Sequence, residues 1–462
     1  MRSPTFTVLS AALFAVCAPA AKAQSNAELL NELQALKARI GELEKKLGEQ
    51  PKPGTPQWGM TPEQVQDFNR IAVKTEALED NAEASGFKGL KISGVIDPTY
   101  IVNKNQRTSS FVFLNNFAGT DVFAYDNSYF GMAVIDFQKE LEGGTRWRLT
   151  LAPHKSVGSN YNFPSIVHEA SVSIPITDLA TRFWAGQIPD WSGYEYYLAN
   201  QNKLVTHNMM FDFLAPTFYT GIGTDMTIDK WIVKTALGNM NSARNIVGAD
   251  GTALRDPVFS TRVDYSKGEF NGFGGALQYG RVTNNGAAGG YSTLANGEVD
   301  AYFIRGDLTL QGQINLGSQK NAAFNGGDSA WWGLSGLAAY KMTPRLELVS
   351  RLDYIDNHKN GGGTFNIGFG IDAAGAATPD GRNGFGPGMV QGSDGSWALG
   401  DASKGANRTA LSLGVNYALT SNAVLKAEYR YDYASQAVFQ VLPDGNWRKD
   451  NQVFGTSVVV SF

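Results

Sequence analysis

Apolar and polar residues alternate along most of the chain, from about residue 88 to the last residue. Between Tyr302 and Leu316, apolar or small residues occupy every second position, and from Arg305 onward the positions between them are polar. The same alternation returns around Leu348, Leu411 and Tyr429. A β-strand with this period presents one apolar face and one polar face. The pattern predicts an all-β structure over residues 87–462.

The number of strands is a check on this prediction. Fifteen alternating segments can be marked, and the one over residues 298–316 is longer than the roughly 9 to 11 residues that a membrane-crossing strand needs. We therefore expect a tight turn inside it, near Gly306–Asp307 or Gln311–Gly312. The count then becomes sixteen, which fits the even strand numbers of bacterial membrane barrels.

Alternation alone also fits a soluble sandwich or barrel, so the loops must separate the two classes. Short turns at 142–145, 342–344 and 420–422 alternate with long segments rich in Gly, Asn and Asp, the longest from about Asp356 to Asn407. Short turns at one end and long loops at the other are typical of an antiparallel transmembrane β-barrel with an apolar exterior. Aromatic residues near strand ends are expected at the membrane interfaces: Tyr340, Tyr354, Tyr417, Trp331 and Trp332.

The first 23 residues have the pattern of a secretory signal peptide. Arg2 precedes an apolar run over residues 8–16, and Ala21 and Ala23 supply small residues at a cleavage site. Beyond residue 23 there is no run of 18 apolar residues, so we expect no helical membrane anchor.

Residues 24–50 follow a heptad pattern, which predicts a helical coiled coil. Its a and d positions are Leu29, Leu33, Leu36, Ile40, Leu43 and Leu47. A single amphipathic helix packed on its own domain is the alternative. In the coiled-coil interpretation the chain is a homo-oligomer, and the a and d residues do not decide between two and three strands. A Pro-rich linker over 51–60 and a short helix over 61–86, begun by Thr61 and Pro62, would follow.

Composition excludes several classes of function. The 462 residues carry a net charge of −4, so no basic field would attract nucleic acid. The only cysteine, Cys17, lies in the leader, which excludes a disulfide, a thiolate zinc site or a cysteine nucleophile in the mature chain. The four histidines have no metal-ligand spacing, and no nucleophile elbow or phosphate loop is present. We expect no enzyme, no metal and no cofactor.

With these features the sequence resembles the Gram-negative outer-membrane porins. The last strand places Phe454, Thr456 and Val458 on one face and ends in the aromatic Phe462. The heptad segment resembles the periplasmic coiled coil of the DcaP-like trimeric porins. The run Ala-Gly-Gln-Ile-Pro-Asp-Trp-Ser-Gly-Tyr-Glu over 185–195 is similar to the segment where the fifth strand of phosphate-selective and related porins enters the third loop.

The resemblance implies passive diffusion of small hydrophilic solutes through a pore narrowed by the third loop, about 191–216. Candidate constriction residues in that loop are Glu195, Lys203, His207 and Asp212. The charged residues expected to line the pore are Arg146, Arg148, Arg305, Asp307, Arg345, Glu347, Arg351, Asp353, Lys426, Glu428, Arg430 and Asp432. Seven are positive and five negative, a small excess that favours anions. Neighbouring charges that pair across strands along a wet wall are the alternative.

The resemblance also implies an outer-membrane location with lipid around the barrel, a trimer, and a coiled coil in the periplasm. The competing function is a structural protein of the envelope, in which the barrel is only an anchor and the coiled coil binds a partner.

Overall fold

The computed structural model describes residues 37, 39, 61–84, 87–113, 130–152, 166–241, 256–286, 289–367, 369–371 and 377–462. These residues belong to two units, divided after Lys88. The predicted leader, the 51–60 linker and all of the heptad segment except Lys37 and Arg39 lie outside the described residues. Of the described residues, none belongs to a helix that is long and apolar enough to cross a membrane.

Helix α2, Pro62–Ala84, is the described element of the first unit. The Thr61 amide donates to Gln64 Oε1, 3.0 Å, and the Gln64 amide donates to Thr61 Oγ1, 3.3 Å. This reciprocal pair is a capping box, which satisfies amide groups that the first turn leaves without partners. The helix therefore begins where Thr61 and Pro62 predicted.

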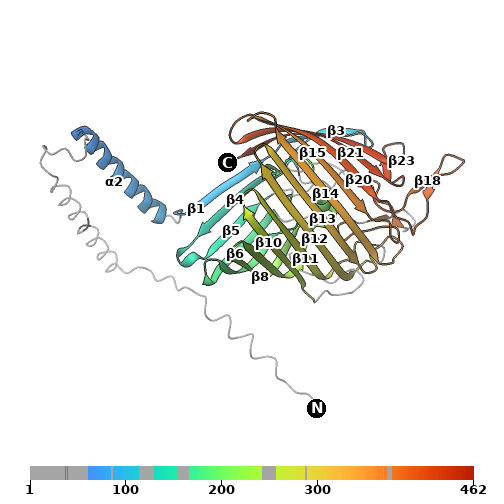
Figure 1. The fold of residues 1–462 in the computed structure, drawn as a ribbon, viewed down its shortest axis with the longest axis horizontal. Helices are drawn as coiled ribbons and strands as arrows, with labels where there is room; N and C mark the ends of the chain where they lie inside the picture. Colours follow the sequence, from blue (N-terminus) through green and yellow to red (C-terminus); the bar gives the residue numbers. More distant parts are fainter. Residues whose placement is uncertain are drawn as a thin grey trace, which may run out of the picture. The chain divides into compact units, whose positions relative to one another are not determined.

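The second unit is a closed antiparallel β-barrel (Figure 1). Its sheet contains eighteen strands. They are β1 Leu90–Ile96, β2 Thr99–Asn103, β3 Thr108–Val112, β4 Ala133–Glu140, β5 Arg146–Leu151, β6 Val167–Asp178, β7 Thr181–Pro189, β8 Phe218–Ile228, β9 Trp231–Met240, β10 Val258–Gly268, β11 Asn271–Thr283, β12 Tyr291–Arg305, β13 Leu308–Gln319, β14 Ser329–Lys341, β15 Leu346–Asp356, β20 Arg408–Ala418, β21 Ala423–Ala434 and β24 Asp450–Ser461.

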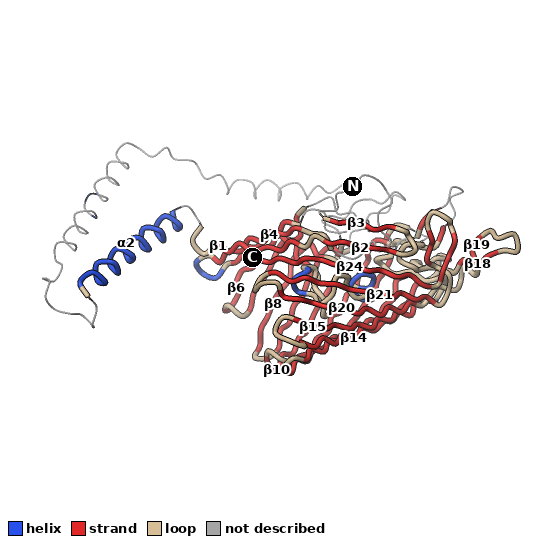
Figure 2. Tube along the Cα trace, turned by 90° about the horizontal axis from the view of Figure 1, so that it is seen from above, coloured by secondary structure: helices blue, strands red, loops and turns tan. Residues whose placement is uncertain are grey.

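These eighteen strands make sixteen crossings of the barrel. Strands β1 and β2 both pair with β24 and are one crossing interrupted at Pro98, which has no N–H to donate to a neighbouring strand. Strands β3 and β4 pair with β2 and β1 and form the second crossing. Figure 2 shows β24 between β21 and β2, where the last crossing meets the first and closes the barrel. The predicted count of sixteen is confirmed.

The predicted break in the 298–316 segment is confirmed at Gly306–Asp307. Strand β12 ends at Arg305 and β13 begins at Leu308, with Arg305 paired to Leu308. Gly306 has a φ of +57°, a conformation that tight hairpin turns require and that glycine adopts without a steric penalty.

From β4 onward, turns of two to five residues alternate with longer connections, so the two kinds lie at opposite ends of the barrel. Three small hairpins belong to the long connections: β16 Gly370–Ile371 with β17 Ala377–Thr378, β18 Met389–Gln391 with β19 Trp397–Leu399, and β22 Phe439–Val441 with β23 Asn446–Arg448. In Figure 1, β18 and β23 lie at the end of the barrel away from the C-terminus.

The outward face of the barrel is apolar. Leu413 is 52% exposed and Ile314 is 52% exposed, whereas their neighbours Ser412 and Asn315 are buried inside. An apolar exterior around a polar interior is the reverse of a soluble protein and is the architecture of a transmembrane barrel.

The aromatic residues expected at the interfaces divide between the two faces. Tyr340, Tyr417 and Trp332 are 40–49% exposed on the outside, and Tyr354 contacts Trp332 at 5.2 Å between ring centroids. Trp331 is a correction: it is buried inside the barrel, and its indole N–H donates to Asn315 Oδ1, 3.1 Å. Two consecutive strand residues must point to opposite faces, so Trp331 and Trp332 cannot both meet the membrane.

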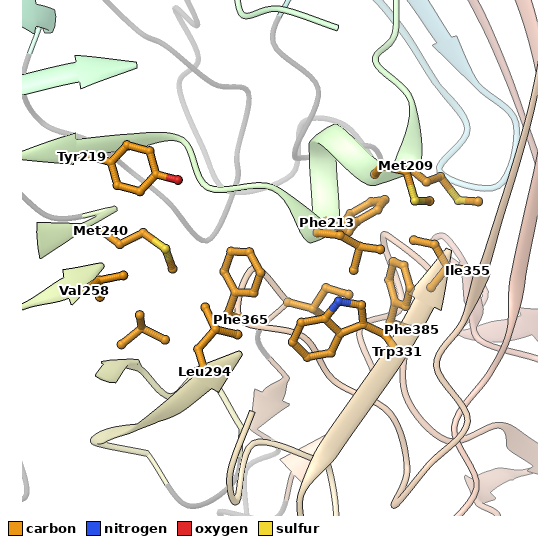
Figure 3. Packing of buried hydrophobic residues seen from close by; sticks show 14 of the residues in the cluster. Met209, Phe213, Tyr219, Met240, Val258, Leu294, Trp331, Ile355, Phe365 and Phe385 are labelled. Carbon is orange, nitrogen blue, oxygen red and sulfur yellow. The ribbon is translucent and has the colours of Figure 1, made fainter. Parts of the chain in front are cut away.

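The main apolar cluster lies within the barrel and joins the 191–216 loop to the long 357–407 connection. Helix α3, Met209–Leu214, places Phe213 against Phe385, with ring centroids 4.7 Å apart. Trp331 and Phe365 are 5.9 Å apart in the same cluster (Figure 3). Part of the interior is therefore filled by packed side chains rather than by water.

Candidate functional site

The 190–217 connection folds into the barrel and binds one part of its inner wall. The Lys426 ammonium donates to the carbonyls of Ala199, 2.7 Å, and Asn202, 2.5 Å. The backbone amides of Val205 and Thr206 donate to Glu428 Oε2 at 2.9 and 2.7 Å. Charged side chains of β21 thus satisfy backbone groups of a loop that would otherwise be buried without partners.

Two fully buried arginines hold the middle of this loop. Arg351 of β15 donates to the carbonyls of Thr206 and His207, each at 2.8 Å, and to Glu195 Oε1 at 2.9 Å. Arg430 of β21 donates to the His207 carbonyl at 3.0 Å. Breaking such a buried, charge-assisted network leaves an uncompensated charge, so the loop is firmly attached.

Two of the loop residues expected at a constriction, Glu195 and His207, are buried in or beside this network. Glu195 is buried on Arg351, and burial raises its pKa to about 7. His207 stacks on Phe211, with ring centroids 4.3 Å apart, and burial lowers its pKa to about 3. His207 therefore carries no charge at neutral pH.

Of the other two candidates, one is paired with the wall and one is buried in the short helix of the loop. Lys203 forms an ion pair with Glu347 Oε1 at 2.7 Å, and Asp212 is buried on α3. In the structure Glu195, Lys203 and His207 lie against the charged face of β15 and β21, where Glu195 and His207 are buried and Lys203 stays partly exposed.

The residue that the loop presents to the interior is Tyr196, which sequence reasoning missed. Its side chain lines a cavity inside the barrel and it is 53% exposed. Glu195 is buried on the wall, and the side chain of the next residue, Tyr196, faces the cavity. The signal in the sequence that could have pointed to Tyr196 was its neighbour Glu195, the last residue of the porin-like run over 185–195.

The cavity lies between the loop and strands β5 to β13 and has a volume of about 700 Å³. Arg148 of β5 donates to Asp136 Oδ1 at 2.8 Å and lies 3.3 Å from Glu169 Oε2. Arg262 of β10 lies 2.7 Å from both Asp264 and Asp300. Sequence reasoning found Arg148 but missed Arg262 and its acidic partners.

The twelve residues expected on the pore wall occupy three environments. Arg351, Asp353, Lys426, Glu428, Arg430 and Asp432 are buried under the loop or in the network around it, and Glu347 is bound to Lys203. Arg148 lines the cavity. Arg146 pairs with Glu140, 2.9 Å, beside a short turn.

The remaining three of the twelve are at short turns, which corrects their expected place on the lumen face. Arg345 and Asp307 are exposed turn residues. Arg305 is in register with Leu308, on the same face as the outward Phe303 and Leu310. The turn at Gly306–Asp307 reverses the chain, so the alternation of β13 cannot be extended through it into β12.

Among the described residues, no group of three or more histidine, cysteine, aspartate or glutamate side chains is arranged to hold a metal ion.

Comparison with protein families shows which family the chain belongs to. It belongs to the family described as "Protein of unknown function (DUF3138)", whose model matches residues 59–462. No curated protein matches the chain.

Solved structures with a similar fold include three outer-membrane barrels, and each comparison covers 81% of this chain. They are the outer-membrane expressed OmpT of Vibrio cholerae (12% identity, 97% of that chain, TM-score 0.48), an anion-selective porin from Comamonas acidovorans (10%, 99%, 0.48) and the outer membrane channel DcaP of Acinetobacter baumannii (10%, 97%, 0.47). The fold itself rests on the strand pairings described above.

Proposed function

We propose that this DUF3138 protein is an outer-membrane porin through which small hydrophilic solutes diffuse passively. One observation carries the proposal: a closed barrel of sixteen crossings has an apolar exterior and a cavity of about 700 Å³ lined by charged side chains. A polar lining lowers the cost of moving a hydrated solute past the membrane, and no chemical step is needed. The predicted signal peptide supports export to the outer membrane.

In this proposal the 191–216 loop sets the width of the passage. The loop is attached to β15 and β21 by Arg351, Arg430 and Lys426, so its position is fixed by buried hydrogen bonds. In this proposal solutes pass through the cavity between Tyr196 and the wall around Arg148 and Arg262.

The positions of the predicted cations do not support the anion preference that the sequence favoured. Arg351, Lys426 and Arg430 are buried under the loop, and Arg305 and Arg345 are at the short turns. Arg148 is the one member of the seven predicted cations that lines the cavity among the described residues.

The test of the proposal is conductance. Purified, folded protein inserted into planar lipid bilayers should give stepwise ionic currents. A folded barrel that inserts and gives no current would contradict the porin function.

A homo-oligomer, most simply a trimer joined through the 24–50 heptads and the barrel wall, is part of the proposal. The envelope tether remains the second candidate, because α2 exposes the apolar side chains of Phe68 and Ile71, about 60% each. Deleting residues 26–50 separates the two. A porin should still conduct as a barrel, whereas a tether should keep its barrel and lose its partner in the envelope.

A further inference from the structure

Carboxylates outnumber cationic groups around the cavity. Five acidic residues and three basic residues line it: Glu169, Asp190, Asp225, Asp264 and Asp300 against Arg148, Lys234 and Arg262. The sequence count of seven positive to five negative is therefore reversed where the interior is open.

Both arginines at the cavity are bound by more than one carboxylate. Arg148 contacts Asp136 and Glu169, and the Asp136 side chain is almost covered. A guanidinium that donates to two carboxylates leaves one negative charge in excess at that place.

Arg262 has three acidic partners, one more than Arg148. Its guanidinium contacts Asp264, Glu298 and Asp300 at 2.7 to 2.9 Å. The Arg262 side chain is 9% exposed, whereas the Asp264 side chain is 25% exposed. The group that this cluster presents to the interior is consequently a carboxylate rather than the guanidinium.

The exposed Tyr196 ring lines the same cavity as Arg262, Asp264 and Asp300. A tyrosine ring attracts a cation over its face and adds no charge of its own. Tyr196, on the loop side of the cavity, therefore adds no positive charge that would balance the negative charge of the wall.

We propose that the passage selects cations over anions, and that Asp264 and Asp300 are the residues that set this preference. The inference rests on the proposed porin function and names its solute class as small cations, including ammonium compounds. Charges lining a narrow, partly dehydrated passage act more strongly on a permeating ion than the same charges do in open water.

The experiment measures the reversal potential of the full-length protein in planar bilayers under a KCl gradient. The wild-type protein should show a K⁺ to Cl⁻ permeability ratio above one. The double variant Asp264→Asn with Asp300→Asn should lower the ratio by at least about fivefold, since removing even one unit charge at about 4 Å in water changes the energy of an ion by about 1 kcal/mol. Glu298 remains as a partner for Arg262 in this variant. The matched control is Glu269→Gln in the exposed turn between β10 and β11, which should leave the ratio unchanged.

The outcomes separate the two proposals. Conductance with a ratio at or below one overturns the cation preference and leaves the porin function standing. A ratio above one that the double variant does not lower overturns the assignment to Asp264 and Asp300. If the double variant fails to fold, Asp264→Asn alone and Glu169→Gln at the second cluster should each lower the ratio, and failure of both to do so contradicts the inference. Absence of any conductance from folded protein overturns the porin function and the inference together.

Discussion

The inner wall of the barrel has two parts that use the same residue types in different ways. On β15, β20 and β21, Arg351, Arg408 and Arg430 are fully buried, because the 191–216 loop and the 357–407 connection lie on them. On β5 and β10, Arg148 and Arg262 border a cavity in company with carboxylates. The alternating pattern places a charged residue on the inner face of a strand. Whether that residue stabilises the fold or lines the cavity depends on the loop that covers it.

The largest expected difference between the two parts is in stability. Arg351→Ala removes the cation that Glu195 and Asp353 face, and breaking a buried ion pair in this way costs about 3 to 5 kcal/mol. Arg148→Ala removes a partly exposed side chain and should cost about 1 kcal/mol. Urea unfolding in lipid vesicles measures both free energies. If both variants lost the same unfolding free energy, the distinction between a covered and an open part of the wall would be wrong.

The outer face can be tested against the inner face within one strand. Ile314→Arg places a charge toward the lipid near the middle of β13 and should lower the free energy of unfolding by about 2 to 4 kcal/mol. Gln311→Arg, which lines the cavity, should be tolerated. The same vesicle unfolding experiment gives both values, and a reversed order would show that the facing assignment is wrong.

The width of the passage should depend on Tyr196. Tyr196→Ala removes the exposed ring on the loop and should raise the single-channel conductance while changing the unfolding free energy little. Tyr196→Phe keeps the ring and serves as the control, with conductance close to wild type. An unchanged conductance in the alanine variant would place the narrowest point elsewhere.

The smallest effect is expected for a buried cation of the covered wall. Lys426→Met should leave the K⁺ to Cl⁻ permeability ratio unchanged, because this ammonium donates to the Ala199 and Asn202 carbonyls beneath the loop. A clear change in the ratio, with the protein still folded, would mean that the covered wall is accessible to ions.

Much of the barrel could be predicted from local pattern. The period of two identified the faces of β13, β15, β20 and β21, and the excessive length of one segment located the turn at Gly306–Asp307. Errors arose where the pattern was extended through that turn, which misplaced Arg305. Ten residues of β12 and β13, 291–297 and 317–319, lie outside the marked 298–316 segment, in part because Leu294 and Asn296 are flanked by small residues.

The site could not be predicted to the same degree. That the loop enters the barrel followed from a resemblance, but which side chains it covers depends on contacts between residues far apart in sequence. Arg351 meets Glu195 and His207 across about 150 positions, and nothing local marks Arg351 as buried and Arg148 as open. Tyr196 was overlooked because a neutral ring is no obvious pore residue.

Cysteine accessibility tests the two-part wall most directly, since the only cysteine in the sequence, Cys17, lies in the predicted leader. Ser171→Cys lies at the cavity on β6, and Ser412→Cys lies on β20 under the covered network. A charged, thiol-specific reagent added during bilayer recording should reduce the current through Ser171→Cys and leave Ser412→Cys unaffected. Block of Ser412→Cys with no effect on Ser171→Cys would contradict the account.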